Sequence, residues 1–323
     1  MSMATSLTDL GAVSQRNFFG LYCQKQMSNI GCRMNLTLVR VSVFVCVGAS
    51  LSAWNFPARA HGDMHAQIVE TTRQIERDPG NAQLYFNRGE FHRAHRDWDL
   101  AQADYDRAIV LNPQLGVVDF ARGSLYLEAG WLQSAKVALD RFLKKYPNHV
   151  EALVARARTS MKLDEPSAAA RDYTLAIAAG TESRPDIYIE RAQALTAGDK
   201  PDPEAALRGL EEGIKKLGPL ITFQLYAIDI EIKQKHFEAA LSRLDEVMAK
   251  SPRKESWLAR RGEILQQAGR TAEAREAFEA ALKAIATLPA ARRQVPAMLD
   301  LEKRLRSDLE GLAVGLEKPQ PEK

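Results

Sequence analysis

Four of the six histidines in the chain have a spacing that suggests a metal site. They are His61, His65, His92 and His95. Imidazole nitrogens bind zinc and copper well. His92 and His95 are three residues apart, so both would lie on one face of a helix. This spacing leads to the hypothesis that the four side chains bind zinc or copper.

Two predicted helices would have to bring these histidines together. Residues 63–78 are predicted as one helix, which ends before the turn sequence at residues 79–81, and a second helix follows. In such an antiparallel hairpin, His65 would lie opposite His95. Alternatively, His92 packs between helices, His95 lies in a turn and the segment after His61 is a flexible start. The sequence leaves both interpretations open.

A short apolar segment precedes the first histidine. Residues 41–54 form an uncharged run of 14 residues, which is shorter than the roughly 20 that a membrane-spanning helix needs. Arg33 and Arg40 precede the run, and the small-residue triplet at residues 58–60 follows it. This pattern predicts a secretory signal peptide that is removed before His61. An uncleaved anchor helix is the alternative.

The leader over residues 1–60 begins with an unusually long segment. Residues 1–33 are too long and too mixed in composition for the basic start of a signal peptide. We therefore expect the true start of translation at Met27 or Met34, with the earlier residues upstream of it.

Cysteine and excess positive charge are confined to this predicted leader. Residues 1–60 hold all three cysteines, five basic groups and one acid, which leaves 39 basic and 40 acidic groups in the remainder, a net charge of −1. This balance gives no indication of nucleic acid or an anionic membrane as a partner, so no stable membrane insertion is expected after cleavage. A chain without cysteine tolerates an oxidising compartment. The sequence thus predicts a periplasmic or secreted protein, exported by a Gram-negative type of cell.

Beyond residue 80 the sequence repeats with a period of 34 residues. Three kinds of residue recur at this spacing, and a proline closes the unit at Pro113 and Pro147. The recurring positions are a small residue (Gly89, Gly123, Ala157), an alanine (Ala101, Ala135, Ala169) and a large apolar residue (Tyr105, Leu139, Tyr173).

This pattern resembles the tetratricopeptide repeat (TPR), a helix pair with a small residue in the first helix and an alanine and an aromatic in the second. The resemblance implies an all-α, right-handed superhelical solenoid of antiparallel helix pairs, whose first helices line a concave groove. Six units are predicted within residues 82–288, at residues 82–115, 116–149, 150–184, 185–220, 221–254 and 255–288.

The predicted solenoid has a cap at each end, because its last repeats would otherwise expose apolar faces. Residues 61–81 are predicted as an N-terminal capping helix and residues 289–315 as a C-terminal one with a polar outer face. The charged, proline-rich tail at residues 316–323 is predicted to be disordered.

The resemblance also projects two rows of side chains onto the groove. An apolar row alternates with a polar row, which suits an extended or helical peptide, although the apolar row could instead pack helix against helix. Some TPR domains bind a carboxyl terminus with lysine and asparagine; the projected set holds Lys162 and Lys233 but no asparagine, so this mode is not predicted. The predicted partner-binding residues are Phe86, Glu90, Phe120, Ser124, Val154, Arg158, Ile189, Gln193, Leu225 and Asp229.

An arginine precedes the small residue in five of the six units, at Arg88, Arg122, Arg156, Arg191 and Arg261. As a functional row it would bind acidic groups, whereas as structure it would pair within or between repeats. The structural interpretation is favoured, with Arg88 paired to Asp104 and Arg156 to Asp172, because guanidinium forks onto a carboxylate.

No motif of a nucleophile, phosphate loop or catalytic zinc is present in the sequence. We therefore predict a non-enzymatic, exported scaffold that needs no cofactor and binds a protein or peptide partner in the cell envelope. The alternative is a periplasmic metal-binding protein that uses the four histidines at the N-terminal rim.

Overall fold

A computed structural model describes residues 59–180 and 184–316. The predicted leader lies outside these residues, apart from Arg59 and Ala60. The predicted tail, apart from Leu316, lies outside them as well.

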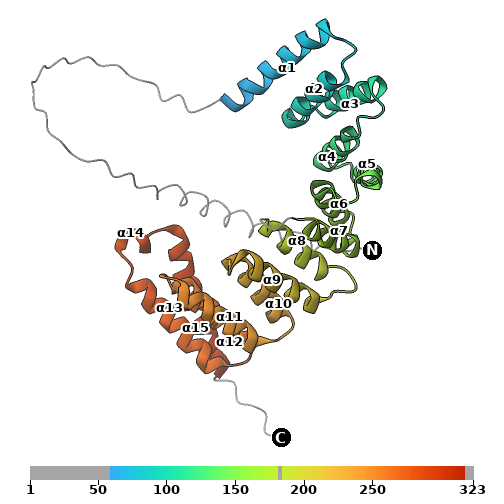
Figure 1. The fold of residues 1–323 in the computed structure, drawn as a ribbon. Coiled ribbons are helices and arrows are strands. Elements are labelled where there is room, and N and C mark those ends of the chain that lie inside the picture. Colours follow the sequence, from blue (N-terminus) through green and yellow to red (C-terminus); the bar gives the residue numbers. More distant parts are fainter. Residues whose placement is uncertain (1–58, 181–183, 317–323) are drawn as a thin grey trace, which may run out of the picture. The chain divides into compact units, whose positions relative to one another are not determined.

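Helices account for all the regular structure in the described residues (Figure 1). The first eight are α1 (Arg59–Arg77), α2 (Ala82–His95), α3 (Trp98–Leu111), α4 (Val117–Ala129), α5 (Leu132–Lys145), α6 (Val150–Lys162), α7 (Pro166–Ala178) and α8 (Pro185–Leu195). The others are α9 (Pro203–Leu217), α10 (Ile221–Lys233), α11 (Phe237–Lys250), α12 (Glu255–Gln267), α13 (Thr271–Ala286), α14 (Ala290–Arg293) and α15 (Pro296–Leu316).

These helices pack as successive pairs in chain order (Figure 1). The first helices of the pairs are α2, α4, α6, α8, α10 and α12, and each packs against the second helix that follows it. Each second helix also contacts the next first helix, and α2 contacts α4 as α4 contacts α6. The predicted all-α solenoid of antiparallel helix pairs is therefore confirmed.

The turn inside each pair is sharp and uses a left-handed backbone conformation. Gly130 and Gly269 adopt it with φ of 82° and 75°, at no steric cost. Arg96, Asp164 and Lys235 adopt it with φ of 68°, 60° and 60°. In these three residues the Cβ atom makes the conformation strained, so the turn geometry is maintained by the packing of the two helices.

The small residues of the repeat allow the two helices of a pair to approach closely. A Cβ atom at Gly123 would lie 2.5 Å from Leu139, and one at Gly262 would lie 2.3 Å from the ring of Phe278. Leu139 and Phe278 are fully buried. The sequence prediction for this position is confirmed in both repeats, since no side chain fits between the helices.

Ion pairs within repeats and at the junctions between them explain the row of arginines. Arg156 on α6 donates two hydrogen bonds to Asp172 on its own second helix, at 2.8 and 2.7 Å, and a third to Asp140 on the preceding second helix, at 2.8 Å. Arg88 likewise binds Asp104 at 2.9 and 2.7 Å. The two predicted pairs are thus confirmed.

The other arginines of the row also bind within the stack. Arg122 pairs with Asp106 and Arg261 with Asp245, each 16 residues earlier on the preceding second helix. Arg191 donates to Glu212 at 2.8 Å. The structural interpretation of the arginine row is therefore confirmed, because each guanidinium is held by a neighbouring helix.

In the fifth repeat the arginine of the junction lies on the second helix and not on the first. Ala227 occupies the arginine position of α10. Arg243 on the second helix α11 forms ion pairs with the acidic residues of this junction instead. Its guanidinium lies 2.6 Å from Glu231 on α10 and 2.6 Å from Glu211 on the preceding second helix α9. Glu231 is buried, and its Oε2 atom has no hydrogen bond among the described residues.

Single helices close the two ends of the stack. α1 packs against α2, and α15 packs against α13 through four buried side chains, Met298, Leu301, Leu305 and Leu312. The short helix α14 precedes α15, which begins at Pro296. Within the described residues, no helix combines the length and the apolar character that crossing a membrane requires.

Candidate functional site

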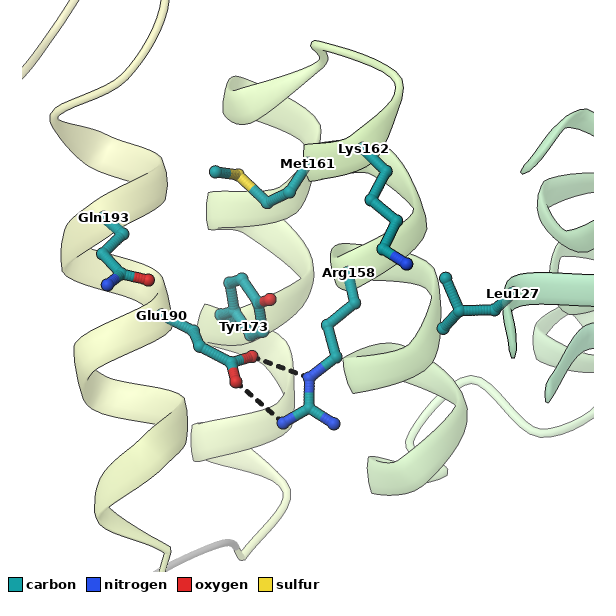
Figure 2. Close-up of a pocket in the computed structure, with 7 residues that line it drawn as sticks. All are labelled: Leu127, Arg158, Met161, Lys162, Tyr173, Glu190 and Gln193. Carbon is teal, nitrogen blue, oxygen red and sulfur yellow. Dashed lines mark hydrogen bonds and ion pairs between the residues drawn. The ribbon is translucent and has the colours of Figure 1, made fainter. Parts of the chain in front are cut away.

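Side chains from three successive first helices, α4, α6 and α8, and from α7 line an open hollow on the described part of the chain (Figure 2). Its volume is about 340 Å³. The side chains that line it are Leu127 from α4, Arg158, Met161 and Lys162 from α6, Tyr173 from α7, and Glu190 and Gln193 from α8.

A forked ion pair forms one wall of this hollow. Arg158 donates from Nε and Nη2 to the two carboxylate oxygens of Glu190, at 2.9 and 2.8 Å (Figure 2). Nη2 also donates to Asp186 at 3.2 Å. The pair joins α6 to α8, so it fixes the spacing of two first helices at the site. Its hydrogen bond with Glu190 raises the pKa of Arg158, which keeps this side chain charged.

Tyr173 closes the inner side of the hollow and is almost fully buried. Burial and the neighbouring Glu190 carboxylate raise the pKa of the Tyr173 hydroxyl, so this group stays protonated. A neutral hydroxyl can donate a hydrogen bond to Glu190, which stabilises the ion pair from the inner side of the hollow. The inner side is therefore preorganised.

The other wall of the hollow is more open. Lys162 is exposed at the end of α6, and Figure 2 shows its ammonium group extending toward Leu127. Among the described residues Lys162 forms no ion pair, and Arg158 Nη1 forms no hydrogen bond. Leu127 and Met161 hold the same repeat position, 34 residues apart, on α4 and α6. This side of the hollow combines apolar surface with uncompensated positive charge.

A similar polar group lies on the same face at the first repeat. Arg93 on α2 donates to Glu90 at 2.9 Å and pairs with Glu128 on α4. The Tyr105 hydroxyl donates to Glu90, and burial and this carboxylate raise the pKa of Tyr105. Glu90, predicted as a partner-binding residue, is thus held by neighbours within the stack.

Two further predicted polar residues also bridge consecutive first helices. Gln193 on α8 donates to the Tyr226 hydroxyl on α10 at 2.8 Å. Arg260 on α12 donates to Asp229 on α10 at 2.6 Å. The face formed by the first helices is therefore a ladder of contacts between repeats, on which a partner would find many polar groups already bound.

The predicted apolar row lies partly in the core. Val154 is only 3% exposed, which makes it a packing residue rather than a contact surface. The Phe120 ring packs against Phe142 and His149, at centroid distances of 5.4 and 5.1 Å. The remaining members, which are half-buried, are Phe86, Ile189 and Leu225, together with Ser124 of the polar row.

The histidines predicted to bind metal are spread over two helices. His65 is exposed on α1, and the side chain of His61 lies outside the described residues. On α2, Nδ1 of the buried His92 lies 3.5 Å from Asp97 Oδ2, and Nδ1 of His95 lies 3.1 Å from the same oxygen. Among the described side chains no group of three or more His, Cys, Asp or Glu is arranged to hold a metal ion.

Sequence reasoning did not select Leu127, Met161, Tyr173 or Glu190 for the site. A signal for Glu190 exists in the sequence, because opposite charges recur at separations near one repeat on the first helices. Arg158 and Glu190 are 32 residues apart, Asp229 and Arg260 31 apart. Spacings of this kind indicate contacts across repeats.

The pairs of helices and their inter-repeat ladder define a helical-repeat protein of the solenoid class. Comparison with family models identifies the repeats more closely. Residues 120–185 match the model "Tetratricopeptide repeat", and residues 189–300 match the model "Tetratricopeptide repeat-like domain". The chain thus contains TPR domains. No curated protein matches the sequence.

Several solved structures of TPR proteins are similar to this chain at low sequence identity. A TPR protein from Parabacteroides merdae is 18% identical, with a TM-score of 0.45, over 76% of this chain and 93% of that one. PilF from Pseudomonas aeruginosa is 16% identical, with a TM-score of 0.46, over 59% of this chain and 86% of that one. At this level of similarity the two structures do not indicate which ligand this chain binds.

Proposed function

We propose that this protein is an exported TPR scaffold whose first-helix face binds a protein or peptide partner in the cell envelope. The TPR fold itself is suited to protein interaction, because stacked repeats present a continuous face. The observation that carries the proposal is the hollow across α4, α6 and α8, where apolar side chains lie beside Lys162, a cation that forms no ion pair among the described residues. No catalytic role and no cofactor is part of the proposal.

An extended peptide fits this face better than a small molecule does. Consecutive first helices lie about 8–10 Å apart in packed helical structures, so a strand of six or seven residues, at about 3.3 Å each, crosses three of them. The ladder of ion pairs holds the face rigid, which lowers the cost of ordering it on binding. The proposed contact surface is the hollow together with the half-buried Phe86, Ser124, Ile189 and Leu225.

Export rests on the sequence pattern of residues 1–60 and on the absence of cysteine beyond them. N-terminal sequencing of the protein purified from a periplasmic extract tests this part of the proposal. A mature chain that starts at His61 supports export with cleavage, whereas recovery of intact residue 1 from the cytoplasm overturns it.

Site-specific photo-crosslinking tests the binding face. A crosslinking amino acid replaces Gln193 on the first-helix face or, as a matched control, Leu175, which is 50% exposed on the second helix α7. Each variant is expressed as the full chain, irradiated in cells and examined for crosslinked proteins by mass spectrometry. We expect a discrete partner at position 193 and none at 175. Crosslinks at 175 alone would contradict the proposed face.

Metal binding at the N-terminal rim is the second candidate function. This candidate rests on the sequence spacing of the histidines. In the structure His92 and His95 both approach the Asp97 carboxylate, at 3.5 and 3.1 Å, but no group of three or more His, Cys, Asp or Glu among the described side chains is arranged to hold a metal ion. Calorimetric titration of the mature protein with zinc and copper decides it. An affinity that is unchanged in a variant with His92→Ala and His95→Ala would remove these two residues as ligands.

A further inference from the structure

The charges around the hollow indicate what kind of side chain it receives. Resting on the proposed function, we infer that the partner places an acidic side chain, Asp or Glu, against Arg158 and Lys162, within two residues of an apolar side chain on Leu127 and Met161. The partner is therefore a peptide segment with mixed acidic and apolar character. The group that binds is the side-chain carboxylate of an internal residue of the peptide, not its carboxyl terminus.

The charge balance of the lining leaves one cation without a partner. Arg158 uses Nε and Nη2 for Glu190, and Nη2 also for Asp186. The remaining nitrogen, Nη1, and the Lys162 ammonium lie on the same helix, four residues or about 6 Å of rise apart. Glu190, the single acid in the lining, is already neutralised by its fork with Arg158. A ligand carboxylate therefore meets a net positive surface.

Apolar surface lies next to these cations on the α4 side. Leu127 and Met161 come from equivalent positions of consecutive first helices, so they form a pair of apolar contacts across the α4–α6 boundary. Successive side chains of an extended peptide are about 3.3 Å apart along the strand. Since successive side chains point to opposite faces, an acidic side chain above α6 places the side chain two residues away, about 6–7 Å along the strand, between α4 and α6.

The face continues on both sides of the hollow, which favours a side-chain carboxylate over the end of a chain. On one side the ladder continues through Arg93 and Glu128, which join α2 to α4. On the other side it continues through Gln193 and Tyr226, which join α8 to α10. A peptide can therefore run past the hollow in both directions, and nothing in the lining requires it to end there.

Selection from peptide libraries tests the inference directly. A random dodecapeptide library, displayed on phage so that both ends continue into the coat protein, is selected on the mature protein and on Lys162→Glu. Lys144→Glu is the matched control, because Lys144 is an exposed lysine on the second helix α5. We expect acidic residues next to apolar residues to be enriched on the parent and on the control variant, and this enrichment to be lost on Lys162→Glu.

Binding of individual peptides gives the magnitude. The most enriched peptide, blocked at both ends, is compared by fluorescence anisotropy with its Asp→Asn and Glu→Gln version. Lys162→Gln should weaken binding of the acidic peptide by up to about fivefold, the upper end for a solvent-exposed ion pair, and leave binding of the amide version unchanged. The difference should shrink between 50 and 500 mM salt, since exposed charges are screened.

Three outcomes overturn the inference: enrichment without acidic residues, acidic enrichment that survives Lys162→Glu, or stronger binding of a neutral peptide with a free carboxyl terminus. The crosslinking experiment separates this failure from failure of the proposed function. A partner captured at position 193 whose capture is insensitive to Lys162→Glu refutes the acidic contact alone, whereas a partner captured at 175 alone refutes the binding face.

Discussion

Replacing Gly262 with alanine should destabilise the last helix pair, α12 and α13. The new methyl group would lie 2.3 Å from Cε1 and 2.4 Å from Cδ1 of Phe278, far inside van der Waals contact. Phe278 is fully buried and cannot swing away. Overpacking of this kind costs about 1–3 kcal/mol. The helix propensity of alanine offsets about 1 kcal/mol of that cost.

A second glycine isolates the packing contribution. Gly311 lies in α15, is exposed, and would place its Cβ with no heavy atom within 4 Å. Gly311→Ala therefore gains the helix-propensity term alone, about 1 kcal/mol. The difference in the free energy of unfolding between the two variants should then equal the overpacking cost, about 1–3 kcal/mol.

Urea unfolding followed by circular dichroism measures this difference, and hydrogen exchange of α12 and α13 shows where it acts. The comparison uses midpoints because a repeat array need not unfold in one step. The third repeat already holds Ala157 opposite Tyr173, so a helix pair can be spaced to accept a methyl group. If Gly262→Ala proved as stable as Gly311→Ala, the α12–α13 spacing would not be fixed by the Gly262–Phe278 contact.

Three further predictions concern backbone strain, buried ion pairs and pH. Lys235→Gly should raise the free energy of unfolding by about 0.5–1 kcal/mol, seen as a higher urea midpoint, because it relieves the backbone strain of a left-handed residue at φ 60°. No gain would mean that the turn is unstrained. Arg156→Ala should cost about 3 kcal/mol, and Arg275→Ala in an exposed pair less than about 1, as judged by thermal unfolding; equal losses would contradict the junction role. Burial raises the pKa of Glu231 in the folded protein, so the stability that its protonated form contributes is present below the pKa of the unfolded chain and is lost as pH rises. Glu231→Gln does not lose this stability, so it should become more stable relative to the parent from pH 4 to 7. Burial alone would raise the pKa of Glu255, but backbone hydrogen bonds and Arg253 outweigh burial and hold this pKa below its ordinary value. The stability that the ionised carboxylate contributes is lost as pH falls, so Glu255→Gln should lose stability relative to the parent as pH rises in the same titration.

The sequence was sufficient to predict the interactions that occur within one repeat. Arg88–Asp104 and Arg156–Asp172 each join residues 16 apart, and this separation follows from the helix-pair register alone. The approach of Gly123 to Leu139 follows from the same register.

Interactions between consecutive first helices were harder to predict, because they depend on the offset between neighbouring helix pairs. The Arg158–Glu190 fork spans 32 residues and the Arg93–Glu128 pair 35, so no single separation identifies them. This is why Glu190 was missed, and why Arg158 was predicted as a partner-binding residue without its contact to Glu190. The histidine hypothesis needed both a helix register and side-chain directions, and the sequence supplied the first alone.

The junction ion pairs also determine whether the acid on a second helix keeps a partner when the repeat after it is lost. Glu211 on α9 and Asp245 on α11 are equivalent acids, each following the large apolar residue of its repeat, Leu210 and Leu244. Deleting residues 221–254 would remove Arg243 and bring Glu211 to the place where Arg261 now meets Asp245. A shortened chain would therefore keep a matched pair at this position of the new junction, while Arg260 would lose Asp229.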